Sequence, residues 1–324
     1  MTYELKKVIE LQEIINNEYK NIVGLIVMRE GEKVYENYFN GGTSTNIIHI
    51  ASATKSIISI LIGIAIDKGY IKSIDQKVLD FFPNYTVKRC EKNIQNVTLR
   101  NMITMTAPFK FKSEPYTKFF ASDDWVNATL DLLGGKGKIG EFRYTPIIGP
   151  DILSGILVNT TGQPVLDFAT ENLFSPLGIK VERNVILHNK DEHMAFLKGK
   201  NMNGWVVDPK GTNTAGWGLN LTPVDMAKIG QLYLDGGVWN KRQLVSAQWI
   251  DESTKEHSRW NELSYGYLWW IENGKGYSAI GDGGNVIYIS KEKKIVISIA
   301  SLFMPRAKDR IELIKEHIEP IFDI

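Results

Sequence analysis

Apolar positions at helical spacing predict an opening helix over residues 4–18, and two strand-like apolar runs follow at 22–28 and 33–39. The polar residues 29–32 join these runs and predict a hairpin. Near the other end of the chain, four further short strands are predicted at residues 265–270, 276–280, 285–290 and 295–301. The chain closes with a predicted helix over about 305–318, because its first residue is a proline, which the first helical turn accepts.

Between the two groups of strands the pattern is mostly helical. Thr222 followed by a proline and by the acid Asp225 predicts a helix that ends before the glycine pair 236–237. Thr98 predicts the start of a shorter helix. The most apolar stretch, residues 57–66, has roughly half the ~20 residues that a membrane span needs, so we expect a buried core helix there.

Strands at both ends and helices between them predict an α+β fold, in which the two termini complete one antiparallel sheet flanked by helices. A mainly helical lobe is then inserted in the middle of the chain. We expect a sheet lobe of residues 1–85 and 215–324, a helical lobe of residues 86–214, and the active site between them.

The composition argues against several classes of partner. The chain has 324 residues with 38 Lys and Arg against 37 Asp and Glu, a net charge of +1, whereas proteins that bind nucleic acid or anionic membranes usually carry a basic excess. The single cysteine, Cys90, excludes an internal disulfide framework and a multi-thiolate metal site. His188 and His193 do not have a usual zinc spacing and are interpreted as surface residues. We therefore expect no nucleic acid, no metal and no cofactor.

The N-terminal residues 1–20 mix charged and apolar side chains, and a basic stretch followed by an apolar run is not present there. The chain as given is therefore expected to be cytoplasmic, without a membrane segment. If a leader has been removed from it, an extracytoplasmic location is expected instead.

The sharpest chemical signal is Ser52-x-x-Lys55 at the start of the apolar helix. Residues three apart lie on the same face of a helix, so the hydroxyl and the amine can meet. The amino end of a helix favours a developing alkoxide, and the apolar surroundings disfavour an ammonium ion. A lysine that is neutral for part of the time is a competent base for a serine nucleophile.

The spacing alone is a weak signal. Ser290 and Lys293 satisfy it as well, but the charged residues around them indicate a solvated turn, where the lysine stays charged. For Ser52 the structural alternative is a helix cap beside a lysine that extends along the first turn.

Further segments carry a resemblance to a known family. They are 98–106, Phe142-Arg143-Tyr144-Thr145-Pro146, 153–162, 214–226 and 265–270. Together with Ser52-x-x-Lys55, they resemble the serine β-lactamase and penicillin-binding protein superfamily over nearly the whole chain. The likeness is to its class C-like branch, which also contains esterases and 6-aminohexanoate-dimer hydrolases. The resemblance implies a β-lactamase/transpeptidase-like fold.

The resemblance also implies roles for single residues. Tyr144 would share a proton network with Lys55, help to deprotonate Ser52 and protonate the leaving group. Pro146 stands where the family usually has an asparagine, and it cannot offer that side-chain amide to the lysine or the substrate. The backbone amides of Ser52 and Gly284 would form the oxyanion hole.

The third family segment corresponds to Gly281-Asp282-Gly283-Gly284-Asn285, which by itself also fits a tight turn between strands. The family's basic residue is missing, and Asp282 would repel the carboxylate of a β-lactam. An ester, or an amide with a free amino group, is therefore favoured as substrate. Asp282, Gly283, Asn285, Trp217 and Tyr116 are expected to contact it.

Three functions stay open at this point. The favoured one is a serine hydrolase that forms an acyl-enzyme with a small-molecule ester, amide or β-lactam-like substrate. The second is a true β-lactamase or D-alanyl-D-alanine carboxypeptidase. The third is a penicillin-binding or sensor protein that does not turn over, which the altered third segment and Pro146 keep open.

Overall fold

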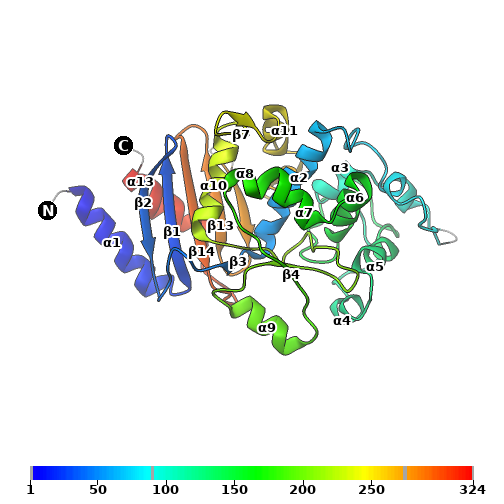
Figure 1. Ribbon diagram of the computed structural model, residues 1–324, viewed down its shortest axis with the longest axis horizontal. Helices are drawn as coiled ribbons and strands as arrows, with labels where there is room; N and C mark the ends of the chain where they lie inside the picture. The colour runs from blue at the N-terminus through cyan, green and yellow to red at the C-terminus, as the bar shows by residue number, and fades with distance from the viewer. Residues whose placement is uncertain (1–2, 89–90, 273–275, 323–324) are drawn as a thin grey trace.

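The computed structural model describes residues 3–88, 91–272 and 276–322, so Cys90 lies outside the described residues. The chain folds around one eight-stranded sheet with the strand order β2-β1-β14-β13-β12-β11-β10-β9, in which every neighbouring pair is antiparallel. The predicted hairpin at the start of the chain pairs with the last strand, which confirms that both termini complete the sheet (Figure 1). The strands of the sheet are β1 (Ile22–Arg29), β2 (Glu32–Tyr38), β9 (Ser258–Trp260), β10 (Leu263–Tyr265), β11 (Trp270–Ile271), β12 (Tyr277–Gly281), β13 (Asn285–Ser290) and β14 (Ile295–Ser301).

Helices cover both faces of the sheet. In Figure 1, α1 and α13 lie on one side of it and α10 on the other. Along β14 the side chains of Ile295, Ile297 and Ile299 pack in the hydrophobic cluster on the side of α1 and α13. Val296 and Ala300 pack in the cluster on the side of α10. This alternation is the period of two that a strand requires when it is buried on both faces.

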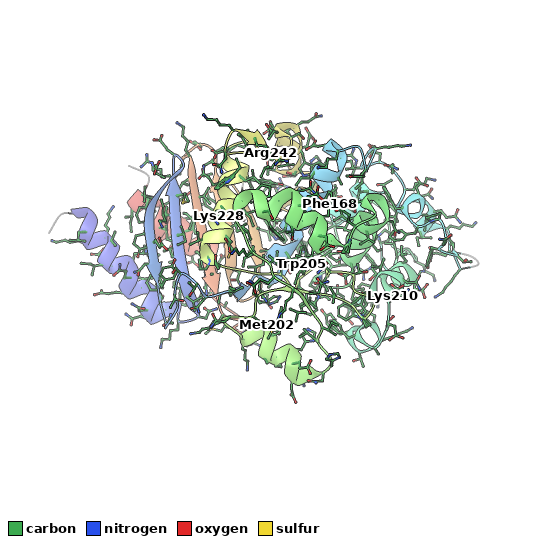
Figure 2. The ribbon with its side chains drawn as sticks, viewed as in Figure 1. Phe168, Met202, Trp205, Lys210, Lys228 and Arg242 are labelled. Carbon is green, nitrogen blue, oxygen red and sulfur yellow. The ribbon has the colours of Figure 1, made fainter. Side chains whose placement is uncertain are left out.

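The other half of the chain is mainly helical, with α2 running between it and the sheet (Figure 1). Trp205 is fully buried near the centre of the molecule (Figure 2), and its indole nitrogen donates to the carbonyl of Thr214 at 2.8 Å. The helices are α1 (Tyr3–Glu18), α2 (Thr54–Asp67), α3 (Leu99–Ile103), α4 (Tyr116–Phe120), α5 (Trp125–Leu132), α6 (Asp151–Thr161), α7 (Val165–Ala169), α8 (Ser175–Leu177), α9 (Lys190–Lys198), α10 (Pro223–Leu234), α11 (Ala247–Ser253), α12 (Arg310–Leu313) and α13 (Glu319–Phe322). Short strand pairs connect them: β3 (Ile48–His49) with β6 (Asn220–Leu221), β4 (Asn184–Val185) with β5 (Trp205–Val206), and β7 (Val238–Trp239) with β8 (Arg242–Gln243).

Two predicted helix starts are confirmed by their caps. The hydroxyl of Thr222 accepts the amide of Asp225, whose carboxylate accepts back from Thr222, and α10 follows. Thr98 caps α3 in the same way. The expected core helix over 57–66 lies within α2, and its residues from 57 to 65 are buried. None of the helices in the described part of the chain combines the length and the apolarity that a membrane span requires.

Two element predictions are wrong in detail. Residues 265–270 do not form one strand, because β10 ends at Tyr265 and Leu268 takes a φ of 63°, which turns the chain before β11. The last helix begins at Arg310 and not near Pro305, since Arg306 has a φ of 54° and Asp309 supplies the cap. The lobe boundaries after residues 85 and 214 stay a prediction.

Candidate active site

Ser52 lies in the tight turn Ala51–Ala53 that leads into α2. Ala51 has a φ of 49°, a left-handed conformation that costs a residue with a Cβ of order 1–3 kcal/mol. The hydroxyl of Thr54 donates to the carbonyl of Ala51 at 2.7 Å and holds the turn. The turn leaves the Ser52 hydroxyl at the wall of two cavities. The side chain makes no cap hydrogen bond for the helix, so the alternative of a helix cap is not supported.

Lys55 is only 1% exposed, and three oxygen atoms surround its amine. Its Nζ donates to the Ser52 hydroxyl at 2.8 Å, to the Pro146 carbonyl at 2.7 Å and to the Gly216 carbonyl at 2.9 Å. Three acceptors match the three N–H groups of an ammonium ion. When one proton leaves, the two carbonyls can keep the other two N–H groups while the lone pair faces the Ser52 hydroxyl. This is the geometry that a base for Ser52 needs.

The loop at Pro146 offers its backbone carbonyl where the family pattern offers a side-chain amide. Glu114 fixes this loop, because its carboxylate accepts the amides of Ile147 and Ile148 at 3.2 Å. Burial raises the pKa of Glu114 above its ordinary value, and these two amides oppose that rise. Gly216 packs on the same loop, since a Cβ there would lie 3.0 Å from the Pro146 carbonyl oxygen. The loop thus compensates for the missing asparagine at the lysine.

Tyr144 lies beside the lysine. The Lys55 Nζ is 5.1 Å from the centroid of its ring, and the ring packs against Trp270 at 5.5 Å and Tyr265 at 6.3 Å. Among the described residues its hydroxyl has no hydrogen bond, which leaves it available to a substrate. Tyr144 and Ser52 line the same cavity.

The turn between β12 and β13 brings backbone amides to Ser52. Gly281, the last residue of β12, packs so closely that a Cβ there would lie 2.0 Å from the Ile50 carbonyl oxygen. The amide of Gly284 donates to the carbonyl of Gly281 at 3.1 Å and closes the turn. Because this amide is engaged, the structure argues against the oxyanion-hole role expected for Gly284.

The amide of Asp282 is the better candidate. It has no hydrogen-bond partner among the described residues. Gly281 pairs with Asn285 across the hairpin, and successive amides of a strand point to opposite edges, so the Asp282 amide points away from β13. Asp282 and Ser52 line the same two cavities. Their two amides are therefore the candidate oxyanion donors.

Of the two other residues in this turn that were expected to contact substrate, Gly283 lines a cavity and Asn285 does not. Gly283 lines one of the two cavities, and its amide donates to the exposed carboxylate of Asp282 at 2.9 Å. Asn285 is 1% exposed, lines neither cavity and bonds to the chain: it donates to the His49 carbonyl at 3.2 Å and accepts the Ser301 amide at 2.9 Å. The structure therefore gives Asn285 the role of a clamp for the turn, not of a substrate contact.

Two cavities meet at Ser52. The first, of about 930 Å³, is here called the aromatic cavity. Its walls include Tyr116, Phe120, Trp125, Ile147, Leu187, His193, Met194, Leu197 and Trp217. The second, of about 690 Å³, is called the polar cavity. Its walls mix charged and apolar side chains and include Tyr144, Trp260, Leu263, Trp270, Ile271, Glu272, Ile280, Asp282, Gly283, Val286, Arg306, Lys308, Asp309, Arg310 and Ile311.

The expected contacts Trp217 and Tyr116 both line the aromatic cavity. Trp217 is 5% exposed, whereas Tyr116 is 42% exposed and lies at the rim. The interpretation of His193 as a surface residue is wrong, because its ring stacks on Trp217 with centroids 4.8 Å apart and the side chain is half-buried. His188 is exposed, as expected.

A buried carboxylate stands behind Lys55. Asp151, at the start of α6, is 2% exposed and accepts the amide of Ala215 at 2.8 Å, while its other oxygen has no hydrogen-bond partner. Burial raises the pKa of Asp151 to about 7, Asp208 adds to this rise, and Lys55 opposes it. Ala215 directly precedes Gly216, whose carbonyl holds Lys55, so Asp151 supports the lysine through the backbone.

The described residues contain no group of three or more His, Cys, Asp or Glu side chains that could hold a metal ion.

The family described as Beta-lactamase matches residues 17–318. The chain belongs to the β-lactamase family. The 6-aminohexanoate-dimer hydrolase of Paenarthrobacter ureafaciens is 23% identical over 303 residues, which cover 85% of this chain and 71% of that protein.

Solved structures of β-lactamase-like proteins share the fold. A penicillin-binding protein homologue from Caulobacter crescentus superposes with a TM-score of 0.70 at 17% identity, covering 94% of this chain and 92% of that one. A family VIII carboxylesterase gives a TM-score of 0.69 at 16% identity and covers 98% and 97%. At these identities the likeness shows the fold alone, and it confirms the predicted α+β, β-lactamase/transpeptidase-like architecture.

Some parts of the site were missed by the sequence reasoning. The carbonyls of Pro146 and Gly216 carry no side-chain signal, so only the folded backbone reveals them. Asp151 precedes an apolar helical run, and an acid in the first turn of a helix looks like ordinary capping. His193 was recognisable only through the packing of α9 on Trp217.

Proposed function

We propose that this β-lactamase-family chain is a serine hydrolase that cleaves a small-molecule ester or amide through an acyl-enzyme on Ser52. The observation that carries the proposal is the set of contacts of Lys55, whose amine is held by two carbonyls and directed at the Ser52 hydroxyl. The names of the relatives, a 6-aminohexanoate-dimer hydrolase and a carboxylesterase, support an amide or an ester as the substrate.

Acylation begins when the Ser52 oxygen attacks the carbonyl carbon of the substrate and its proton passes to Lys55. The carbonyl oxygen becomes an oxyanion, which the backbone amides of Ser52 and Asp282 stabilise. Such donors cost no reorganisation during the reaction, since the turn at Gly281 already fixes them. In this proposal Asp282 replaces Gly284 as the second donor.

Collapse of the tetrahedral intermediate breaks the bond to the leaving group. Tyr144 donates a proton to the departing oxygen or nitrogen and regains one from the lysine, whose Nζ is 5.1 Å from the tyrosine ring centroid. The acyl group stays on the Ser52 oxygen as an ester. Water then attacks this ester, and Lys55 and Tyr144 accept its proton. The bond to the Ser52 oxygen breaks, this oxygen takes the proton back, and the free acid departs.

The experiment follows two chromogenic substrates, a short-chain p-nitrophenyl ester and a cephalosporin, with the wild-type protein and with Ser52→Ala. We expect steady turnover of the ester that Ser52→Ala abolishes, with little turnover of the cephalosporin. Full activity of Ser52→Ala on the ester would contradict the proposal.

Turnover of the cephalosporin, together with labelling by a fluorescent penicillin, distinguishes the other two candidate functions from the proposed one. Preferred turnover of the cephalosporin would favour a β-lactamase or carboxypeptidase. Stoichiometric labelling of Ser52 without turnover of either substrate would favour a penicillin sensor, and both results would replace the proposed ester or amide hydrolase.

A further inference from the structure

We propose that the two cavities bind different parts of the substrate. An uncharged, apolar acyl group binds in the aromatic cavity, and a polar leaving group binds in the polar cavity. The inference deepens the proposed function and rests on it. The two cavities differ in chemistry, and Ser52 lies in the wall of both.

The orientation of the substrate follows from Tyr144. This residue lines the polar cavity and is not part of the aromatic one. A group that protonates the leaving atom has to lie on the side where the leaving group departs. The leaving group therefore points into the polar cavity, and the acyl group is left with the aromatic cavity on the other side of Ser52.

The interior of the aromatic cavity carries no charge at neutral pH. Burial lowers the pKa of His49 to about 3, and its Nε2 accepts the Gly218 amide at 3.0 Å, so the ring is neutral. Burial also lowers the pKa of His193, which stacks on Trp217. The charged side chains that line this cavity, Asp282 and Lys190, are both solvent-exposed, and Asp282 lines the cavity together with Ser52.

Helix α9 supplies one wall of this cavity, with Met194 and Leu197 facing it beside His193. The helix lies next to α4 at the lower edge of Figure 1, and the rings of His193 and Phe120 are 5.3 Å apart. About 930 Å³ is at the upper end of the range of ~300–1,000 Å³ for small-molecule sites. The walls therefore suit a bulky aliphatic or aromatic acyl group, and a charged chain end there would lose its hydration without a counter-ion.

The polar cavity offers both signs of charge. Glu272 accepts the Ser278 hydroxyl at 3.0 Å, and burial raises its pKa. The exposed Arg306 has no ion-pair partner among the described residues, and the exposed Asp309 lies in the same wall. A leaving group with either charge can find an opposite charge here.

Three esters of equal acyl length test whether the acyl group and the leaving group bind in different cavities. They are p-nitrophenyl hexanoate, p-nitrophenyl 6-aminohexanoate, and 3-carboxy-4-nitrophenyl hexanoate, which moves the charge to the leaving group. After correction for their uncatalysed hydrolysis, we expect kcat/KM to fall at least about tenfold with the charge on the acyl group and to change by less than about threefold with the charge on the leaving group.

Variants on α9 tie the preference to the aromatic cavity. Met194→Lys should lower the ratio of hexanoate to acetate turnover about tenfold, and Met194→Glu should raise turnover of the 6-aminohexanoate ester relative to hexanoate. The exposed Ala195 lies next to Met194 but outside this cavity, so Ala195→Lys is the matched control and should leave both ratios unchanged.

The outcomes separate this inference from the proposed function. If turnover depends on Ser52 but the charged acyl group is accepted as well as hexanoate, or if Met194→Lys behaves as Ala195→Lys does, the assignment of the two cavities is wrong and the hydrolase stands. If substitution of Ser52 does not affect turnover, the proposed function itself is wrong, and the inference that rests on it is wrong as well.

Discussion

At the scale of single residues, the chain contains the same Ser-x-x-Lys spacing twice, and only the surroundings distinguish the copies. Lys55 is buried and directed at Ser52 by two carbonyls, whereas Lys293 forms an ion pair with Glu319 at 3.2 Å. The backbone amide of Lys293 donates to the hydroxyl of Ser290 at 3.4 Å, so the second Ser-x-x-Lys segment forms a turn and its lysine amine is not directed at the serine. The physical difference is the environment of the amine.

This contrast gives a matched pair of variants. Ser52→Ala should lower kcat on a p-nitrophenyl ester by at least about 10³-fold, because the nucleophile is lost. Ser290→Ala should keep kcat within about twofold. Since Ser52 makes no cap hydrogen bond, we expect Ser52→Ala to unfold in urea within about 1 kcal/mol of the wild type. Equal activities of the two variants would contradict the assignment.

The spacing and the apolar helix pointed to Ser52 and Lys55, and the resemblance of the other segments to a known family decided in their favour. The loop residues were harder to interpret. Pro146 was expected to weaken the site, and the loop that Glu114 holds supplies a carbonyl instead. Gly284 was expected to donate an amide that in fact closes the turn. Side-chain identity does not report which backbone groups are free, and that is why the resemblance led to Gly284, whereas the folded turn favours the amide of Asp282.

At the scale of elements, the start of α6 supports the lysine from behind. The Asp151 carboxylate accepts the Ala215 amide, and the carbonyl of the following residue, Gly216, accepts a hydrogen bond from Lys55. Burial is the largest cause of the raised pKa of Asp151, and it makes the charged form costly in the folded state.

This burial predicts a pH dependence of stability. The folded pKa of Asp151 is raised from 3.8 to about 7, so its contribution to stability is fully present below pH 3.8 and is lost as the pH rises through about 7. Asp151→Asn removes the ionisation but keeps an oxygen acceptor for Ala215. Urea unfolding at pH 5 and pH 8 should show Asp151→Asn gaining stability relative to the wild type at the higher pH. A difference that is the same at both values would show that Asp151 ionises normally.

At the scale of the whole molecule, the two ends of the chain hold the turn that carries the proposed oxyanion donor, the amide of Asp282. The side-chain amide of Asn21, just before β1, donates to the Gly283 carbonyl at 2.7 Å. Arg310, the first residue of α12, is 3% exposed and donates to the Asn21 side-chain oxygen at 2.6 Å. The apolar pattern predicted that both termini complete one sheet, and this joining of the termini therefore also supports the turn beside Ser52.

A double-mutant cycle tests this support. Asn21→Leu and Arg310→Met should each lower the free energy of unfolding and the kcat on an ester, because both free the turn at Gly283. Their effects should be non-additive, with a coupling of about 0.5–3 kcal/mol in urea unfolding. Strict additivity would show that the two residues act independently.

The walls of the cavities could not be predicted from the apolar pattern, and the predicted lobe boundaries stay a prediction. The apolar periodicity identified the strands at both ends, but the walls of the aromatic cavity come from α4, α9 and the loop at Trp217, which are distant in sequence. Their meeting depends on packing such as that of His193 on Trp217, for which one sequence has no local signal.

Intact-mass spectrometry of the protein quenched in acid during turnover of p-nitrophenyl hexanoate tests the acyl-enzyme on Ser52 most directly. We expect a mass increase of one hexanoyl group, located on the peptide that contains Ser52 and missing in Ser52→Ala. Continued turnover by a protein that never carries the acyl group on Ser52 would contradict it.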